Sequence, residues 1–307
     1  MKYIHLSNLK HAAFLVITWL FITLSPQVMA QHPETRSVGS SRISATPESV
    51  LRSFRDDGMA PVEHELNSEE ISIVNAAFNT LPILHQRILK ERLEGISFLD
   101  NMPNTALTSR IKTGDSVERF HITFRAAILH QTISQWLKEK ELTCFANTSA
   151  DTVISFDAGD LNAIIYVLLH ETTHVVDASI DIFNDLNSPF ATQFLKGVWT
   201  DRTTLLFKNE FLTDNNFHRN GQVYPIVKAP LLYQALQKTP LVSLYSTNSR
   251  NEDLAECLTI YHLTQNLKQP FKMFLTAGGK TILVNDPVKR KEVWNRMKAL
   301  SVFYENG

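Results

Sequence analysis

Residues 168–177 read LLHETTHVVD, the most informative stretch of this chain. It contains the pattern His-Glu-x-x-His, in which His170 and His174 are four residues apart and Glu171 lies between them. In a helix this spacing places both imidazoles on one face, where they can bind one metal ion, with the glutamate beside the metal's water. The stretch therefore predicts a zinc site of the kind that hydrolases use.

The sequence around this motif predicts a buried helix. Asp160 is placed to cap a helix that begins at Leu161, and most of the residues that follow are large and apolar. Burying two histidines and a glutamate is costly unless something compensates them, and a divalent cation would do so. The alternative is that His170 and His174 are core histidines with ordinary hydrogen bonds and an accidental spacing. Zinc is the simpler explanation.

A second acidic segment, NEDLAE, occupies residues 251–256. Glu252 and Glu256 are four residues apart and share a helix face, and Asn251 is placed to cap that helix. One carboxylate can supply the third ligand that an open tetrahedral site needs, while the other accepts the free ring N–H of a ligating histidine. Seen alone, the pair could instead be the solvated acidic face of a surface helix.

Together the two segments resemble the gluzincin zinc metallopeptidases, with the closest likeness to the catalytic domain of anthrax lethal factor. The active helix of that group reads His-Glu-x-x-His-x-Val-Asp, which is matched by His170, Glu171, His174, Val176 and Asp177. Its ligand helix reads Glu-x-x-Ala-Glu, which is matched by Glu252, Ala255 and Glu256. A tyrosine stands seven residues before the ligand glutamate in that group, as Tyr245 does here.

The resemblance implies a role for each matched residue. It makes His170, His174 and Glu252 the zinc ligands, Glu171 the general base, Glu256 a supporting carboxylate and Tyr245 the group that stabilises the oxyanion. Tyr245 could also be a core residue of the apolar run LVSLY. Asp177 is expected to form a supporting hydrogen bond near the helix end, because the third ligand is already supplied.

The likeness spans residues from about 90 to about 300, but its specific part is confined to the two short segments. The interval between His174 and Glu252 is longer than in the toxin, and Asp253-Leu254 replaces an aromatic pair. The implied fold is α+β, a two-lobed zincin-like domain over residues 68–307. Its upper lobe would end near residue 178 with the His-Glu-x-x-His helix, and its lower lobe would carry the glutamate-ligand helix.

Local patterns predict further elements. Residues 151–159 alternate apolar and polar side chains, so we expect an edge strand that could pair with an extended substrate. Residues 277–281, AGGKT, predict a hairpin turn rather than a phosphate-binding loop, because Phe274 stands where that loop needs glycine. We also predict a helix start at residues 67–70, strands at 95–100 and 120–129, and helices at 132–141 and 290–302.

Residues 1–30 predict a secretory signal peptide. Lys2 and Lys10 precede an apolar run at residues 12–24, and Val-Met-Ala supplies a cleavage site after Ala30. The run is shorter than the roughly 18 residues of a spanning helix, so we expect a secreted or periplasmic protein without stable membrane insertion. Residues 31–67 are rich in polar residues and predict a linker or loosely docked arm, with a short helix at 46–54.

Composition limits the function classes further. With a net charge of −1 and 44% hydrophobic residues, the chain lacks the basic excess of nucleic-acid-binding proteins, so we expect no nucleic-acid partner. Cys144 and Cys257 are the only cysteines. In an oxidising compartment they could pair, but buried thiols are the expected state because Cys257 follows Glu256 on an apolar helix.

The sequence thus predicts an exported zinc-dependent metallopeptidase that acts on peptide or protein substrates. Glu171 would be the general base for a zinc-activated water. One alternative is a zincin-fold protein that binds a peptide or a cell-wall component without turnover. Another is a zinc hydrolase of a non-peptide amide. The presence of Glu171 favours catalysis over binding alone.

Overall fold

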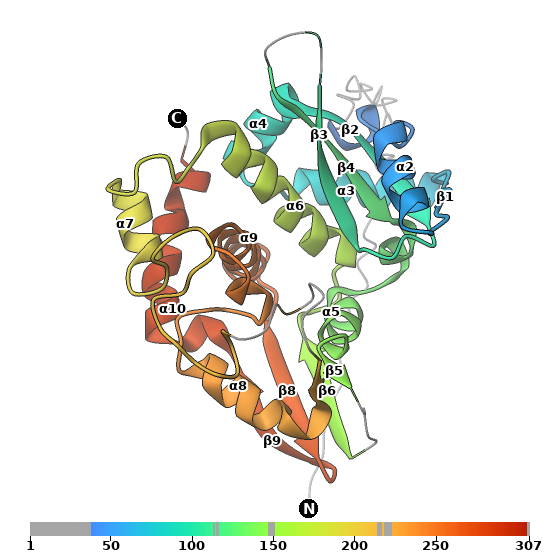
Figure 1. The fold of residues 1–307 in the computed structure, drawn as a ribbon. Coiled ribbons are helices and arrows are strands. Elements are labelled where there is room, and N and C mark those ends of the chain that lie inside the picture. Colours follow the sequence, from blue (N-terminus) through green and yellow to red (C-terminus); the bar gives the residue numbers. More distant parts are fainter. Residues whose placement is uncertain are drawn as a thin grey trace, which may run out of the picture. The chain divides into compact units, whose positions relative to one another are not determined.

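The structure is a computed structural model, and it describes residues 38–112, 114, 117–146, 151–213, 217 and 223–305. Its described residues combine α-helices with three β-sheets (Figure 1), which confirms the α+β class. The predicted signal peptide at residues 1–30 lies outside the described residues. Among the residues that are described, no helix has the length and apolar character needed to cross a membrane.

The elements follow in chain order. The helices are α1 (Val38–Ser41), α2 (Glu48–Asp56), α3 (Ser68–Asn79), α4 (Ile83–Arg92), α5 (Ile133–Leu142), α6 (Ala163–Ile180), α7 (Pro189–Leu195), α8 (Ala229–Gln237), α9 (Arg250–Tyr261) and α10 (Lys291–Met297). The strands are β1 (Val62–Glu63), β2 (Leu93–Asp100), β3 (Ala106–Ile111), β4 (Arg119–Arg125), β5 (Phe145–Ala146), β6 (Thr152–Asp157), β7 (Tyr224–Pro225), β8 (Lys272–Ala277) and β9 (Lys280–Asn285). Short 3₁₀ or π turns are η1 (Ala126–His130), η2 (Ile226–Lys228), η3 (Tyr245–Thr247), η4 (His262–Asn266), η5 (Pro287–Lys289) and η6 (Lys298–Phe303).

The largest sheet has the strand order β1-β2-β4-β3. β2 and β4 are parallel, whereas β1 and β3 pair antiparallel with their neighbours. The central strands bury apolar side chains, among them Phe98 and Phe124, whose stacked rings have centroids 5.4 Å apart. Among the strands that the structure describes, β3 pairs with β4 alone and so forms one edge of this sheet.

Helix α6 is almost entirely buried, as its apolar sequence predicts. It packs against α3, α4, α9 and β3, and Figure 1 shows it between the four-stranded sheet and α9. The expected cap at Asp160 is wrong. The helix begins at Ala163, and the side chain of Asn162 accepts a hydrogen bond from the Ile164 N–H at 3.0 Å. Asn162 is a cap residue as good as aspartate and lies closer to the apolar run.

The segment before residue 67 is folded onto the sheet in its described part, whereas a linker or loosely docked arm was expected there. Helix α2 corresponds to the helix expected at 46–54, and it buries Val50 and Phe54 against Leu99 and Met102. β1 extends the large sheet by pairing with β2. A few well-spaced apolar residues are sufficient to dock this segment, although its average composition is polar.

A second sheet has the order β6-β8-β9 and covers a separate core cluster with α8. β6 confirms the strand expected at 151–159. The Gly-Gly hairpin between β8 and β9 is also confirmed, because Gly278 and Gly279 have φ values of 54° and 73°. Both positive angles suit a tight hairpin turn in which other residues would be strained.

Both cysteines are buried free thiols. Cys144 belongs to the core cluster under the second sheet, and Cys257 belongs to the main core.

The remaining element predictions were correct in position but not always in type. Asn67 caps α3 with a full capping box to Glu70, and Thr132 caps α5. The strand expected at 120–129 ends at Arg125 and continues as η1. The last helix divides into α10 and η6, so the final turns are 3₁₀ rather than α-helical.

Three buried histidines predict a loss of stability in acid. Burial lowers the pKa of His85 to about 3 and the pKa values of His121 and His262 to about 4. The native state therefore keeps them neutral, while the unfolded chain binds protons below its usual histidine pKa of about 6.5. Stability should be full above that pH and should fall, towards pH 4, by about 1.4 kcal/mol per pH unit for each histidine.

Urea unfolding of the metal-free protein between pH 7.5 and 5 measures this slope. His121→Asn should remove about one histidine's share of the slope, whereas His130→Asn, at a more exposed position, should leave the slope close to that of the parent. Equal slopes for the parent and His121→Asn would contradict the assignment.

Candidate metal centre

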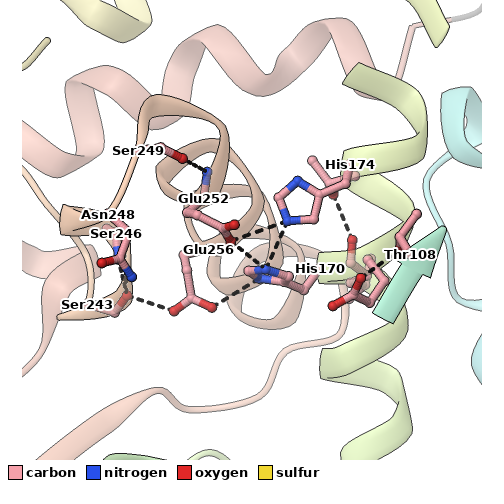
Figure 2. Close-up of polar contacts among 12 residues, drawn as sticks. Thr108, His170, His174, Ser243, Ser246, Asn248, Ser249, Glu252 and Glu256 are labelled. Carbon is pink, nitrogen blue, oxygen red and sulfur yellow. Dashed lines mark hydrogen bonds and ion pairs between the residues drawn. The ribbon is translucent and has the colours of Figure 1, made fainter. Parts of the chain in front are cut away.

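Three donor atoms from α6 and α9 converge at one point (Figure 2). His170 Nε2 and His174 Nε2 are 3.2 Å apart. Glu252 Oε2 lies 3.1 Å from His170 Nε2 and 3.3 Å from His174 Nε2. The structure therefore brings together the three ligands expected from the sequence, on two helices that pack against each other.

These separations fit a tetrahedral zinc ion. A tetrahedral ion about 2.0 to 2.2 Å from each donor sets neighbouring donors roughly 3.3 to 3.6 Å apart, and the three distances found here lie at or just below the short end of that range. Two imidazole nitrogens and one carboxylate oxygen are also a donor set that zinc prefers. Three protein ligands leave a fourth position for water or substrate, which is the arrangement of catalytic rather than structural zinc sites.

His170 is held between two carboxylates. Its Nε2 faces Glu252, and its Nδ1 lies 3.1 Å from Glu256 Oε1, an ion-pair distance without the alignment of a full hydrogen bond. Burial alone would lower the pKa of His170, but the two carboxylates outweigh burial and raise the pKa to about 9. This strong negative field is what a bound cation would neutralise.

Glu256 is itself fixed by several donors. Its Oε2 accepts hydrogen bonds from Ser243 Oγ at 2.7 Å and from Tyr166 Oη at 3.0 Å, and Lys140 Nζ lies 3.3 Å from Oε1. Burial would raise the pKa of Glu256, yet Lys140 and His170 hold it well below its usual range. The carboxylate is therefore ionised and oriented to support His170, as the resemblance implies.

Glu171 lies between the two histidines on α6 and contacts β3. Thr108 Oγ1 donates a 2.6 Å hydrogen bond to Glu171 Oε2, and Figure 2 shows Thr108 close to the histidine pair. The edge strand at the site is thus β3. The strand expected to serve this role, at residues 151–159, is β6, which belongs to a different sheet from β3.

The start of α9 positions Glu252. Ser249, not the expected Asn251, caps the helix, and its side chain accepts a hydrogen bond from the Glu252 N–H at 3.2 Å. Asn251 instead donates its side-chain N–H to Asp177. Asp177 is buried at the end of α6 and joins the two ligand helices, which fits the supporting hydrogen bond expected of it.

Tyr245 lies beside the metal residues. Its ring centroid is 5.6 Å from that of His170, and the residue forms the start of η3, five residues before α9. The ring is half-buried rather than part of the core. The structure therefore places the ring of Tyr245 next to His170, the candidate ligand that faces Glu256.

Four contacting residues were not found from the sequence, namely Thr108, Lys140, Tyr166 and Ser243. Only Tyr166 carried a usable signal, because it is four residues before His170 and shares its helix face. The others come from segments whose sequences show nothing unusual. Their proximity depends on how the sheet and helices pack.

Comparisons of the chain with protein-family models, with curated proteins and with solved structures find no match. Function is therefore inferred from the donor set and its surroundings. Two histidines and one glutamate form a cluster that could hold a metal ion, and Glu171 lies between the two histidines.

Proposed function

We propose that the protein is an exported zinc-dependent metallopeptidase with a two-lobed, zincin-like catalytic domain. The observation that carries this proposal is the triangle of His170 Nε2, His174 Nε2 and Glu252 Oε2, with sides of 3.1 to 3.3 Å. Export to a secreted or periplasmic location is proposed from the signal-peptide pattern at residues 1–30.

His170, His174 and Glu252 would hold the zinc. When bound, zinc supplies Lewis-acid chemistry that activates water and polarises a carbonyl group. Glu171 would accept a proton from the attacking water and transfer it to the leaving amine. The hydrogen bond from Thr108 would keep the Glu171 carboxylate in one orientation for both transfers. Tyr245 would donate to the oxygen on which negative charge develops.

The outer edge of β3, which pairs with no second strand among those the structure describes, supports the proposal of a peptide substrate. The Arg125 N–H donates to the Thr105 carbonyl at 2.9 Å, and the register pairs Leu107 with Thr123. Since hydrogen-bonded and non-hydrogen-bonded pairs alternate in antiparallel strands, Ala106, Thr108 and Arg110 direct their backbone groups away from β4. An extended peptide could pair with those groups, directly beside the strand residue that holds Glu171.

Metal analysis tests the proposal at its first step. The purified protein should contain about one zinc per chain, which chelation removes. His174→Ala should lose the zinc because it deletes a ligand, whereas His130→Ala should keep it. His130 is a suitable control because it also faces a carboxylate, Glu70, at 2.9 Å, but away from the triad. Absence of bound zinc after reconstitution would exclude the proposed function.

A peptide-library cleavage profile of the zinc-loaded protein tests the second step. Cleavage that stops on chelation and returns with zinc is the expected result. Zinc binding without cleavage of any peptide would favour a binding protein or a hydrolase of another amide.

Tyr245→Phe should lower kcat by roughly 10- to 1,000-fold, with little change in KM or zinc content. The substitution keeps the ring beside His170 and removes only the hydroxyl, whose interaction develops in the transition state. Steady-state kinetics on a peptide from the library measure the effect. Tyr224→Phe, which alters a tyrosine of β7 rather than of η3, is a matched control. If kcat were unchanged in Tyr245→Phe, the hydroxyl of Tyr245 would have no role in the reaction and the residue would contribute only packing.

A further inference from the structure

Lys140 is a nearly buried lysine close to the metal residues. It comes from the last turn of α5, and only 16% of its side chain is exposed. Its Nζ lies over three aromatic rings, at 4.4 Å from the centroid of Tyr245, 5.1 Å from Trp136 and 5.9 Å from Tyr166. Burying an ammonium group is costly, and aromatic faces offset only part of that cost.

The remaining compensation comes from Glu256. Lys140 Nζ is 3.3 Å from Glu256 Oε1, the same oxygen that lies 3.1 Å from His170 Nδ1. One ammonium group therefore touches both the carboxylate behind a zinc ligand and the face of the candidate oxyanion tyrosine. These contacts connect α5 to Tyr245 and Glu256, the same two residues that His170 contacts from α6.

The contact between Lys140 and Glu256 changes the net charge around the candidate zinc site. Glu171, Glu252 and Glu256 carry three negative charges around the site, one more than the two positive charges of zinc. Lys140 supplies the missing positive charge. In a buried site such an imbalance is weakly screened, so neutralising it keeps the negative field from opposing the charge that develops on the substrate oxygen.

We propose that Lys140 is a positioning residue of the zinc centre, which fixes the ring of Tyr245 beside His170 and neutralises Glu256 behind it. This inference rests on the proposed peptidase function and deepens it. The competing explanation is that Lys140 only ties α5 to α9, in which case its removal would lower stability without a specific effect on the site.

Lys140→Met tests the proposal because it removes the charge and keeps an apolar stem against the rings. Its zinc dissociation constant, measured by competition with a chromophoric chelator, should rise about 10-fold, because Glu256 loses the contact that holds it behind His170 and this loss outweighs the removal of a nearby positive charge. On a cleaved peptide, kcat should fall about 10- to 100-fold while KM changes little. Lys140→Arg, which keeps the charge, should recover most of both losses.

Two controls make the result specific. Lys138→Met changes an exposed lysine on the same helix and should match the parent in zinc affinity and kcat. In the Tyr245→Phe background, Lys140→Met should have a much smaller effect on kcat, because the group that it positions is already missing. If Lys140→Met lowered kcat by the same factor with Tyr245 and with Phe at position 245, Lys140 would not act by positioning Tyr245. If Lys140→Met left the zinc dissociation constant unchanged, Lys140 would not act through Glu256.

The zinc dissociation constant tests the role of Lys140 even if the protein cleaves no peptide. If the parent protein binds zinc but cleaves no peptide, the peptidase proposal fails, while the comparison of Lys140→Met with Lys138→Met still decides the effect on the metal. Circular dichroism and the melting temperature verify folding of each variant. If Lys140→Met does not fold, Lys140→Gln takes its place with the same readouts and the same expected results.

Discussion

Glu171→Gln should retain zinc and lower kcat by about 100- to 10,000-fold. The substitution preserves size and can still accept the 2.6 Å hydrogen bond from Thr108, but it removes the group that takes a proton from the attacking water. None of the three ligand atoms is changed, so zinc content should equal that of the parent. Metal analysis and steady-state kinetics on the same preparation provide both measurements.

Two comparison variants test whether the fall in kcat is caused by loss of Glu171 as the general base. Glu139→Gln alters an exposed carboxylate on α5 and should leave kcat unchanged. His174→Ala should lose zinc and activity together, unlike Glu171→Gln. Full activity of Glu171→Gln on a peptide that the parent cleaves would show that the general base is another group.

The positions of the metal residues could be predicted from the sequence because the relevant geometry is local. Four-residue spacing on a helix puts His170 beside His174, and Glu252 one turn before Glu256, whatever the rest of the chain does. The spacing could not predict that α6 and α9 pack against each other. The resemblance supplied that pairing, and the donor distances of 3.1 to 3.3 Å agree with it.

The helix starts were harder to predict because several residues could serve as caps. The sequence around the start of α9 contains Asn248, Ser249 and Asn251, all of which are good cap residues. The choice depends on tertiary contacts, since Asn251 bonds to Asp177 on the other ligand helix and leaves Ser249 to cap. Propensity alone cannot decide among residues of nearly equal capping strength.

The supporting residues were missed because they are distant in the chain. Thr108 is 63 residues from Glu171, and Lys140 is 116 residues from Glu256. β3 gave no strand signal, because every one of its residues is partly or fully exposed and its apolar alternation is weak. A site whose two histidines are close in sequence can thus have a third donor and supporting groups that only the folded sheet and helices bring into contact.

Arg296→Met should destabilise the protein by about 3 to 5 kcal/mol, because it leaves a buried carboxylate without its counter-charge. Asp253 is fully buried next to Glu252, and its carboxylate accepts hydrogen bonds from Arg296 and, at 2.9 Å, from Trp199. Arg296 also donates to the carbonyls of Phe194 and Pro240, each at 2.7 Å. Urea unfolding at pH 7 measures the loss.

The pH dependence of that loss identifies its cause. Burial raises the pKa of Asp253, although Arg296 and Trp199 oppose that rise. Without Arg296 the folded-state pKa should rise further above the unfolded value, so protonation stabilises the native state as the pH falls. The deficit of Arg296→Met relative to the parent should therefore shrink towards pH 5, and Asp253→Asn in the same background should recover part of it.

A deficit caused only by lost packing would not depend on pH, which separates the two explanations. Lys298→Met, two residues further along and exposed, should show neither the loss nor its pH dependence.

Because Asp253 follows Glu252 directly on α9, Arg296→Met also tests whether the ion pair between Arg296 and Asp253 holds this helix in place. If it does, Arg296→Met should weaken zinc binding at pH 7, where the Asp253 charge is most costly, more than at pH 6. Equal weakening at both values would assign the ion pair to stability alone.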